Sequence, residues 1–219
     1  ADVAKTAELD STKSWTQDEL KVADVMINDA KNAGADAYAT QLFKQAVNDY
    51  VNSQKALDTK EYKNALDLAL SSQKNAGDAK IFMVTDTKEQ IAEAKKYLAN
   101  HYFSSEYLLS LKQYEEGANL LEEAYYPQAY AQLKSANDSL RSITSQTKKK
   151  RIDNQIEQLD KQVTSISSVH EDSFLNPEFS AINTEFASLK STINSDEFEK
   201  STEALQTIEQ RLDTVRQGQ

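Results

Sequence analysis

The sequence predicts an all-α protein built from antiparallel helical hairpins, and three observations support that expectation. Among its 219 residues are only 4 Gly and 2 Pro, so the residues that form tight turns are scarce. Ala, Leu, Gln, Glu and Lys, which are all good helix formers, are abundant. One pattern of aromatic and small residues also recurs along the chain, with helical spacing on both sides of each copy. From this periodicity we expect about eight or nine helices.

The recurring pattern has an aromatic residue, an aliphatic residue, a second aromatic residue and a small residue at offsets 0, 7, 12 and 15. Its three copies, which start 64 and 72 residues apart, are Tyr50-Leu57-Tyr62-Ala65, Tyr114-Leu121-Tyr126-Ala129 and Phe186-Ile193-Phe198-Ser201. Each copy predicts a helix, a tight turn and a second helix. The small residue lets the first helix approach closely, and the ring before it fills the wedge where the helices diverge. The expected hairpin-junction residues are Tyr62, Ala65, Tyr126, Ala129, Phe198 and Ser201.

The helix ranges follow from end signals and from apolar residues at steps of three, four and seven. The first helix is expected over 14–33, because Ser14 with Gln17 fits a capping box and Gly34 fits a C-terminal stop. Pro127 and Pro177 fit the first turn of later helices, where a missing N–H costs nothing. The remaining helices are expected over 40–57, 61–84, 87–101, 104–123, 127–147, 149–169, 177–193 and 196–216.

Residues 78–101 and 149–169 admit two interpretations, as separate third helices or as continuations of the hairpin helices before them. Neither junction has Pro or a Gly-rich turn, which favours long helices. Long helices would give an elongated rod, and broken ones a compact bundle. The residues of 149–169 that step 4-3-4-3, as in a heptad, are Ile152, Ile156, Leu159, Val163 and Ile166. This stripe meets the preceding one out of phase at 148–151, which favours a bend or a change of contact partners.

The hairpins divide the chain into four expected segments. An N-terminal segment with the first helix covers 1–33. Hairpin units with their extensions cover 34–101 and 102–169, and a third hairpin covers 170–219.

A family resemblance rests on Tyr38-Ala39-Thr40-Gln41-Leu42-Phe43 and on Lys60-Glu61-Tyr62-Lys63-Asn64-Ala65. These stretches resemble an alanine-rich bacterial domain of unknown function, whose hairpins are similar to tetratricopeptide (TPR) hairpins. The match covers residues 30–80, with looser similarity at 126–145 and 177–205. Thr40 stands where that family usually has proline, and the spacings of 64 and 72 differ from the TPR period. The resemblance implies TPR-like hairpins, a cell-envelope or lipoprotein setting and a protein-binding role.

Composition and motifs argue against several functional classes. The net charge of −10 opposes nonspecific binding to nucleic acid, and the longest apolar run has only four residues, Ile81-Phe82-Met83-Val84. The chain has no Cys, only 2 His, and no metal-ligating, phosphate-loop or nucleophile motif. We therefore expect a noncatalytic protein without cofactor or metal and without a transmembrane segment. The first residue is Ala and not Met, so an upstream export signal or lipid-anchored Cys is a further expectation.

The leading functional hypothesis is a protein-binding or scaffold protein of the bacterial periplasm or cell envelope, with the cytoplasm as the alternative location. Amphipathic rings suit binding surfaces, and the expected partner-binding residues are Tyr97, Tyr102, Tyr107, Tyr114, Tyr125, Tyr126 and Tyr130. Two alternatives are a self-associating coiled-coil-like rod and a carrier of a small apolar ligand between helices. The basic run Lys148-Lys149-Lys150-Arg151 is interpreted as a charged surface at a helix junction, with docking of phosphate or an acidic partner as the alternative.

Overall fold

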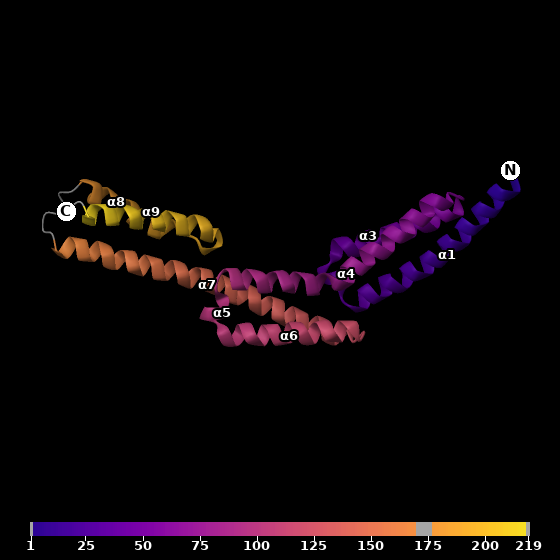
Figure 1. Ribbon diagram of the computed structural model, residues 1–219, viewed down its shortest axis with the longest axis horizontal. Coiled ribbons are helices and arrows are strands. Elements are labelled where there is room, and N and C mark those ends of the chain that lie inside the picture. Colours follow the sequence, from indigo (N-terminus) through magenta and orange to yellow (C-terminus); the bar gives the residue numbers. More distant parts are fainter. Residues whose placement is uncertain (1, 170–176, 218–219) are drawn as a thin grey trace. The chain divides into compact units, whose positions relative to one another are not determined.

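The computed structural model describes residues 2–169 and 177–217 (Figure 1). The described part contains nine α-helices, one short 3-10 helix and no strand, which confirms the all-α prediction. The helices are α1 (Asp2–Asn32), α2 (Ala35–Tyr38), α3 (Thr40–Asp58), α4 (Tyr62–Lys96), α5 (Ala99–Tyr102), α6 (Ser104–Glu122), α7 (Tyr126–Val169), α8 (Pro177–Thr192), η2 (Ser195–Glu197) and α9 (Phe198–Gln217).

The first helix is longer than predicted. It begins at Asp2, so Ser14 and Gln17 lie inside α1 and do not form a capping box there. The capping signal was wrong because the same residue types are tolerated on an exposed helix face, and Ser14 and Gln17 are both exposed. The predicted stop holds, since α1 ends at Asn32 and Gly34 adopts a left-handed φ of 84°.

Two pairs of predicted helices are single helices. The ranges 61–84 and 87–101 merge into α4, which ends at Lys96, and the ranges 127–147 and 149–169 merge into α7. The continuation interpretation is therefore correct for 149–169 and for 78–96, whereas residues after the left-handed Leu98 form the separate helix α5. The physical reason is the one that favoured it: neither junction contains a residue that breaks a helix.

The chain forms two compact units. Unit 1 comprises Ala1–Ala92 and Ser105–Leu140, and unit 2 comprises Glu93–Ser104 and Arg141–Gln219. Because α4 and α7 each contribute to both units, the units do not follow the order of the chain. The four-segment division stays a prediction, and its boundary at 170 lies outside the described residues.

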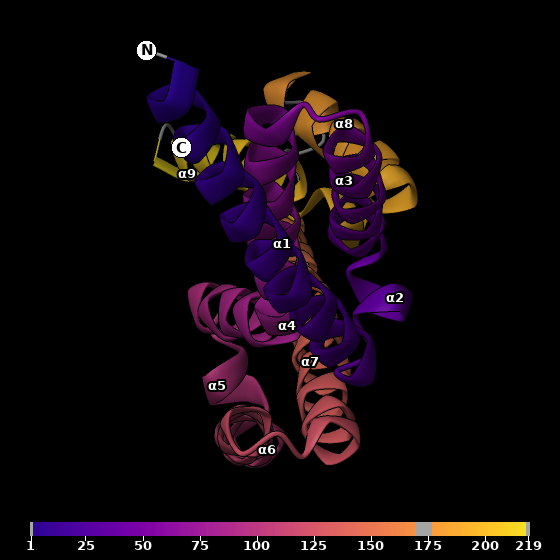
Figure 2. The same cartoon turned by 90° about the vertical axis from the view of Figure 1, so that its right-hand side faces the viewer.

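In unit 1, α1, α3 and the first part of α4 lie side by side (Figures 1 and 2). They pack through small side chains. The buried alanines of this packing are Ala23, Ala30, Ala46, Ala56, Ala65, Ala69 and Ala76. Small residues permit helix backbones to approach, and two hydroxyls use that proximity. Ser53 Oγ donates to the carbonyl of Ala65 at 2.6 Å, and Ser72 Oγ donates to the carbonyl of Ala46 at 2.8 Å.

In unit 2, the later part of α7 packs with α8 and α9 through large side chains. The buried residues of this apolar cluster include Ile152, Leu159, Ile166, Phe179, Ile182, Phe186, Phe198, Leu205, Ile208 and Leu212. Spacing by three, four and seven residues on each helix presents a continuous stripe to the core. The heptad stripe predicted on 152–166 is thus the face that α7 turns toward α8 and α9.

The phase break in α7 marks a change of contact partners. Before it, the carbonyl of Leu133 accepts from Thr87 Oγ1 of α4 at 3.4 Å. After it, Ile152 and Leu159 belong to the cluster with α8 and α9. Of the two predicted outcomes, the structure has the partner change, within an unbroken helix.

The turns between helices recur at a fixed distance. Lys60 follows α3 and Ala124 follows α6, with left-handed φ values of 66° and 62°. Each closes its helix with the same two backbone hydrogen bonds of a Schellman motif. Gly34 and Leu98, with φ values of 84° and 68°, follow α1 and α4. In both pairs the second residue stands 64 residues after the first, which is the spacing of the first two copies of the aromatic pattern.

Candidate functional site

An open groove lies between α8 and α9 in unit 2. Its volume is about 1140 Å³. The α8 residues that line it are Pro177, Ser180, Ala181, Thr184, Glu185, Ser188, Leu189 and Thr192. The α9 residues that line it are Lys200, Glu203, Ala204 and Thr207.

Helical geometry explains why this groove is open. Phe179, Ile182 and Phe186 take the buried face of α8, so Ala181 and Thr184 lie on the exposed face. Small side chains on that face leave the space between the two helices unfilled. Sequence reasoning did not identify this groove, because exposed Ala, Ser and Thr at helical spacing also occur on ordinary helix surfaces.

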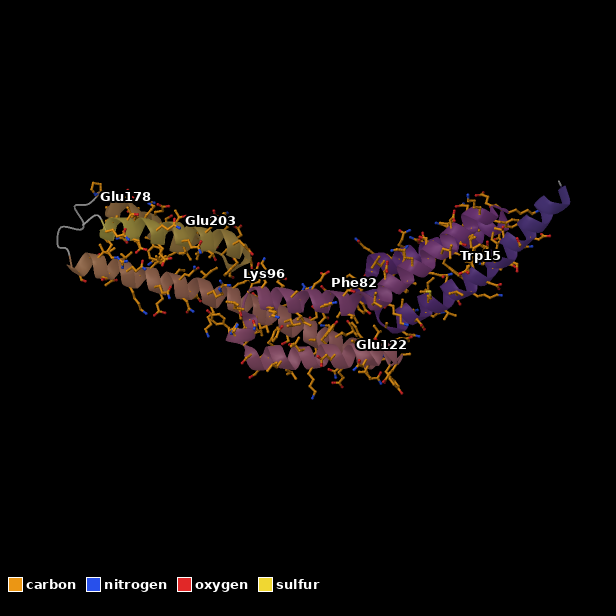
Figure 3. The ribbon with its side chains drawn as sticks, in the orientation of Figure 1. Trp15, Phe82, Lys96, Glu122, Glu178 and Glu203 are labelled. Atoms are coloured by element: carbon orange, nitrogen blue, oxygen red, sulfur yellow. The ribbon has the colours of Figure 1, made fainter. Side chains whose placement is uncertain are left out.

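Carboxylates flank the groove. Arg211 of α9 pairs with Glu178 of α8, with Nη2 2.8 Å from Oε1, and also with Glu185 of the groove wall. Figure 3 labels Glu178 on α8 and Glu203 on α9. Glu203 is exposed and makes no ion pair in the described part of the chain. The groove therefore combines an uncharged floor with one uncompensated carboxylate at its side.

The seven predicted partner-binding tyrosines are divided between the two units. Tyr97 and Tyr102 belong to unit 2, and the other five belong to unit 1. Tyr97 and Tyr107 are buried, and only Tyr125 is more than half exposed, at 54%. Their role in binding stays a prediction, and contacts within the protein account for several of the rings.

Tyr97 is enclosed by charged and aromatic neighbours (Lys96 is labelled in Figure 3). Lys148 Nζ lies 4.0 Å and Lys96 Nζ 4.7 Å from its ring centroid, and Phe198 meets the ring edge-on at 5.3 Å. Its hydroxyl donates a hydrogen bond to the Glu199 carboxylate, which lowers the pKa of Glu199. The hydrogen bond to Tyr97 also raises the pKa of Lys96. These contacts tie α4, α7 and α9 together.

Tyr126 and Tyr130 have partners inside unit 1. Lys80 Nζ donates to Tyr126 Oη at 3.1 Å and pairs with Asp29 at 3.1 Å. Burial opposes the charge on Lys80, but these two hydrogen bonds outweigh it and raise the pKa of Lys80. The Tyr130 ring stacks on Tyr38 at 5.1 Å between centroids.

The predicted hairpin-junction residues stand at helix starts. Tyr62, Tyr126 and Phe198 are the first residues of α4, α7 and α9. The small residues that follow them, Ala65, Ala129 and Ser201, are all buried. Ser201 Oγ also donates to the carbonyl of Asn194 at 2.8 Å, which holds the turn before α9.

The basic run lies at the phase break of α7. Lys148 pairs with Glu93 at 3.1 Å, and Arg151 Nη1 donates to the carbonyl of Tyr97 at 3.4 Å. The Arg151 guanidinium also lies 4.9 Å from the Phe198 ring, and Lys150 Nζ lies 5.4 Å from the Tyr102 ring. Consecutive helical residues point about 100° apart, so this run surrounds the helix where its buried face changes. Long aliphatic stems suit such a position, because they pack while the charge stays in water.

The described residues contain neither a metal-binding cluster nor a candidate membrane-spanning helix. No group of three His, Asp or Glu side chains within 2–169 and 177–217 is arranged to hold a metal ion. In the same ranges, no helix combines the length and apolar character that a membrane crossing requires.

Comparison with known proteins gives no relatives. No protein-family model, no curated protein and no solved structure matches this chain.

Proposed function

We propose that this chain is a noncatalytic protein-binding or scaffold protein that holds a helix of a partner in the groove between α8 and α9. The observation that carries the proposal is the groove itself, which is open and floored by small side chains such as Ala181, Thr184 and Ala204. Two helices with small facing residues form a seat that a third helix can approach closely.

A similar packing arrangement within unit 1 supports a helix as the ligand of this groove. There α1 packs against α3, and the small residues Ala23 and Ala30 of α1 are buried. Gly77 of α4 also lies against α1, since a Cβ on it would stand 3.3 Å from Met26 Cε. The chain therefore already uses small-residue helix pairs to receive a third helix.

The chemistry of the groove defines the partner helix. Thr184, Ser188 and Thr207 offer hydroxyls beside the methyl groups of the alanines. A helix with Ala, Ser or Gly at steps of three and four would fit this floor, and a Lys or Arg beside that stripe would pair with Glu203. The resemblance to an alanine-rich bacterial domain supports a periplasmic or cell-envelope setting, which is part of the proposal. The rod and the small-ligand carrier stay alternatives without an observation in their favour.

A pair of matched substitutions tests the groove. Ala181→Arg places a long side chain in the groove, whereas Ala187→Arg adds the same side chain at an exposed α8 position that does not line it. We expect a partner captured by the unaltered protein from bacterial extract, then purified, to bind Ala181→Arg at least about tenfold more weakly. Ala187→Arg should bind as the unaltered protein does. Equal binding by all three proteins, measured by calorimetry, would refute the groove as the binding site.

A further inference from the structure

We infer that the basic segment of α7 at 141–151 is a docking surface for an acidic segment of another protein. This surface involves α4, α5 and α7, whereas the groove of the proposed function is formed by α8 and α9. The two binding surfaces are therefore formed by different helices, and a test of one is independent of a test of the other.

This segment is strongly basic, whereas the chain as a whole is acidic. Residues 141–151 contain Arg141, Lys148, Lys149, Lys150 and Arg151 and no Asp or Glu, although the chain has a net charge of −10. Such a local excess of cations attracts carboxylates, and the surrounding acidity keeps the surface from binding polyanions nonspecifically.

The same region already binds carboxylates within the chain. Lys148 pairs with Glu93 at 3.1 Å, and Lys96 of α4 pairs with Glu199 at 3.4 Å. Both pairs join different helices and form beside the Tyr97 ring. Within 141–151, Lys148 is thus already paired with a carboxylate in the folded protein.

Two cations remain available to an external ligand. Lys149 and Lys150 are exposed, and neither makes an ion pair in the described ranges. The helix that carries them is fixed on either side by Thr147, which is fully buried, and by Ile152, which is 3% exposed. A fixed backbone lowers the conformational-entropy cost of docking. A ligand can therefore bind these two ammonium groups with little loss of backbone freedom in the protein.

The chemistry favours an acidic peptide over nucleic acid. Lysine ammonium groups act as point charges and lack the bidentate fork with which arginine recognises phosphate, and Arg151 is already engaged with Phe198 and the Tyr97 carbonyl. The expected ligand is therefore a segment with several Glu or Asp residues.

Fluorescence anisotropy with a labelled oligoglutamate peptide tests the inference on the full chain. The double variant K149E/K150E should weaken binding at least about tenfold at low salt. The matched control K44E/K63E makes the same charge change at two exposed lysines of α3 and α4 that form no ion pair in the described part, and should change affinity less than about twofold. Binding should fall as NaCl rises to about 0.15 M, because the Debye length shortens to about 8 Å.

Three outcomes would overturn the inference. The first is no oligoglutamate binding at low salt, and the second is an equal loss in the control variant. The third is that labelled oligothymidylate or inorganic phosphate competes as well as oligoglutamate, which would identify a general anion surface. Circular dichroism of both variants establishes that they are folded.

Discussion

Gly117 on α6 faces Leu133 on α7 so closely that a Cβ on Gly117 would lie 2.7 Å from Leu133 Cγ and 3.1 Å from its backbone nitrogen. Leu133 is itself buried, so neither the side chain nor the backbone has room to withdraw. Gly117→Ala should gain about 0.5–1 kcal/mol from helix propensity but lose about 1–3 kcal/mol to overpacking. We expect a net loss of stability in urea denaturation.

Gly77→Ala is the matched control for that prediction. Gly77 also lies within a long helix, but an added Cβ would meet only Met26 Cε, at 3.3 Å. The end of a methionine side chain can move, so the helix-propensity gain should prevail and the variant should be more stable by up to about 1 kcal/mol. If both glycine variants shift the urea midpoint in the same direction, the close approach of α6 and α7 does not govern stability.

Replacing the left-handed turn residues with glycine should stabilise the protein. Lys60 and Ala124 carry side chains at φ values of 66° and 62°, a conformation that costs non-glycine residues about 1 kcal/mol. Lys60→Gly and Ala124→Gly should each raise stability by about 0.5–1 kcal/mol, and the double variant should approach the sum. Thermal unfolding measures the effect. Lys63→Gly, within the first turn of α4, should instead destabilise, and the opposite ordering would contradict the assigned turn geometry.

The positions of the hairpin turns could be predicted from the sequence because they depend on residues that are close together along the chain. Tyr62 and Tyr126 begin helices and are followed by the buried Ala65 and Ala129, as the spacing predicted. The left-handed conformations of Lys60 and Ala124 could not be predicted in the same way. Neither residue is Gly or Asn, so the hydrogen bonds of the two helices they connect impose a conformation that their own propensities oppose.

The groove and the long helices show the limits of local signals. An exposed Ala181 or Thr184 has no sequence feature that distinguishes a groove floor from an ordinary surface, because the distinction depends on the spacing of two helices. Helix continuation was correctly favoured from the lack of breakers. The start of α1 at Asp2 was missed because a capping signal inside a helix looks like one at its end.

Asp49 is expected to stabilise the contact between α3 and α4. Its buried carboxylate accepts from Gln45 Nε2 at 2.7 Å, from Ser71 Oγ at 2.7 Å and from Asn75 Nδ2 at 2.9 Å. Asp49→Ala leaves these donors without their acceptor, and we expect a loss of about 1–3 kcal/mol in chemical denaturation. A double-mutant cycle with Ser71→Ala isolates the bond between the helices. Strict additivity in that cycle would exclude a contribution from the Asp49–Ser71 pair.

Tyr38 should make the protein sensitive to alkali. Its hydroxyl donates to the carbonyl of Ala33 at 2.6 Å, and its ring stacks between Tyr130 and Phe82. Burial is the largest cause that raises the pKa of Tyr38 well above its ordinary value, followed by repulsion from Tyr130 and Asp36. A raised folded-state pKa stabilises the fold fully below the unfolded value near 10, and this contribution is lost as pH rises above that value.

Tyr38→Phe separates the titration from the packing. At neutral pH the variant lacks one hydrogen bond and should be less stable than the unaltered protein by about 1 kcal/mol. Above a pH of about 10 the unaltered protein loses stability through Tyr38 ionisation in the unfolded chain, whereas the variant does not, so the difference should narrow. Urea midpoints from neutral to strongly alkaline pH measure this convergence. Tyr125→Phe, at a position more than half exposed, provides the reference, and a Tyr38→Phe difference that stays constant with pH would show that the buried hydroxyl does not control alkaline stability.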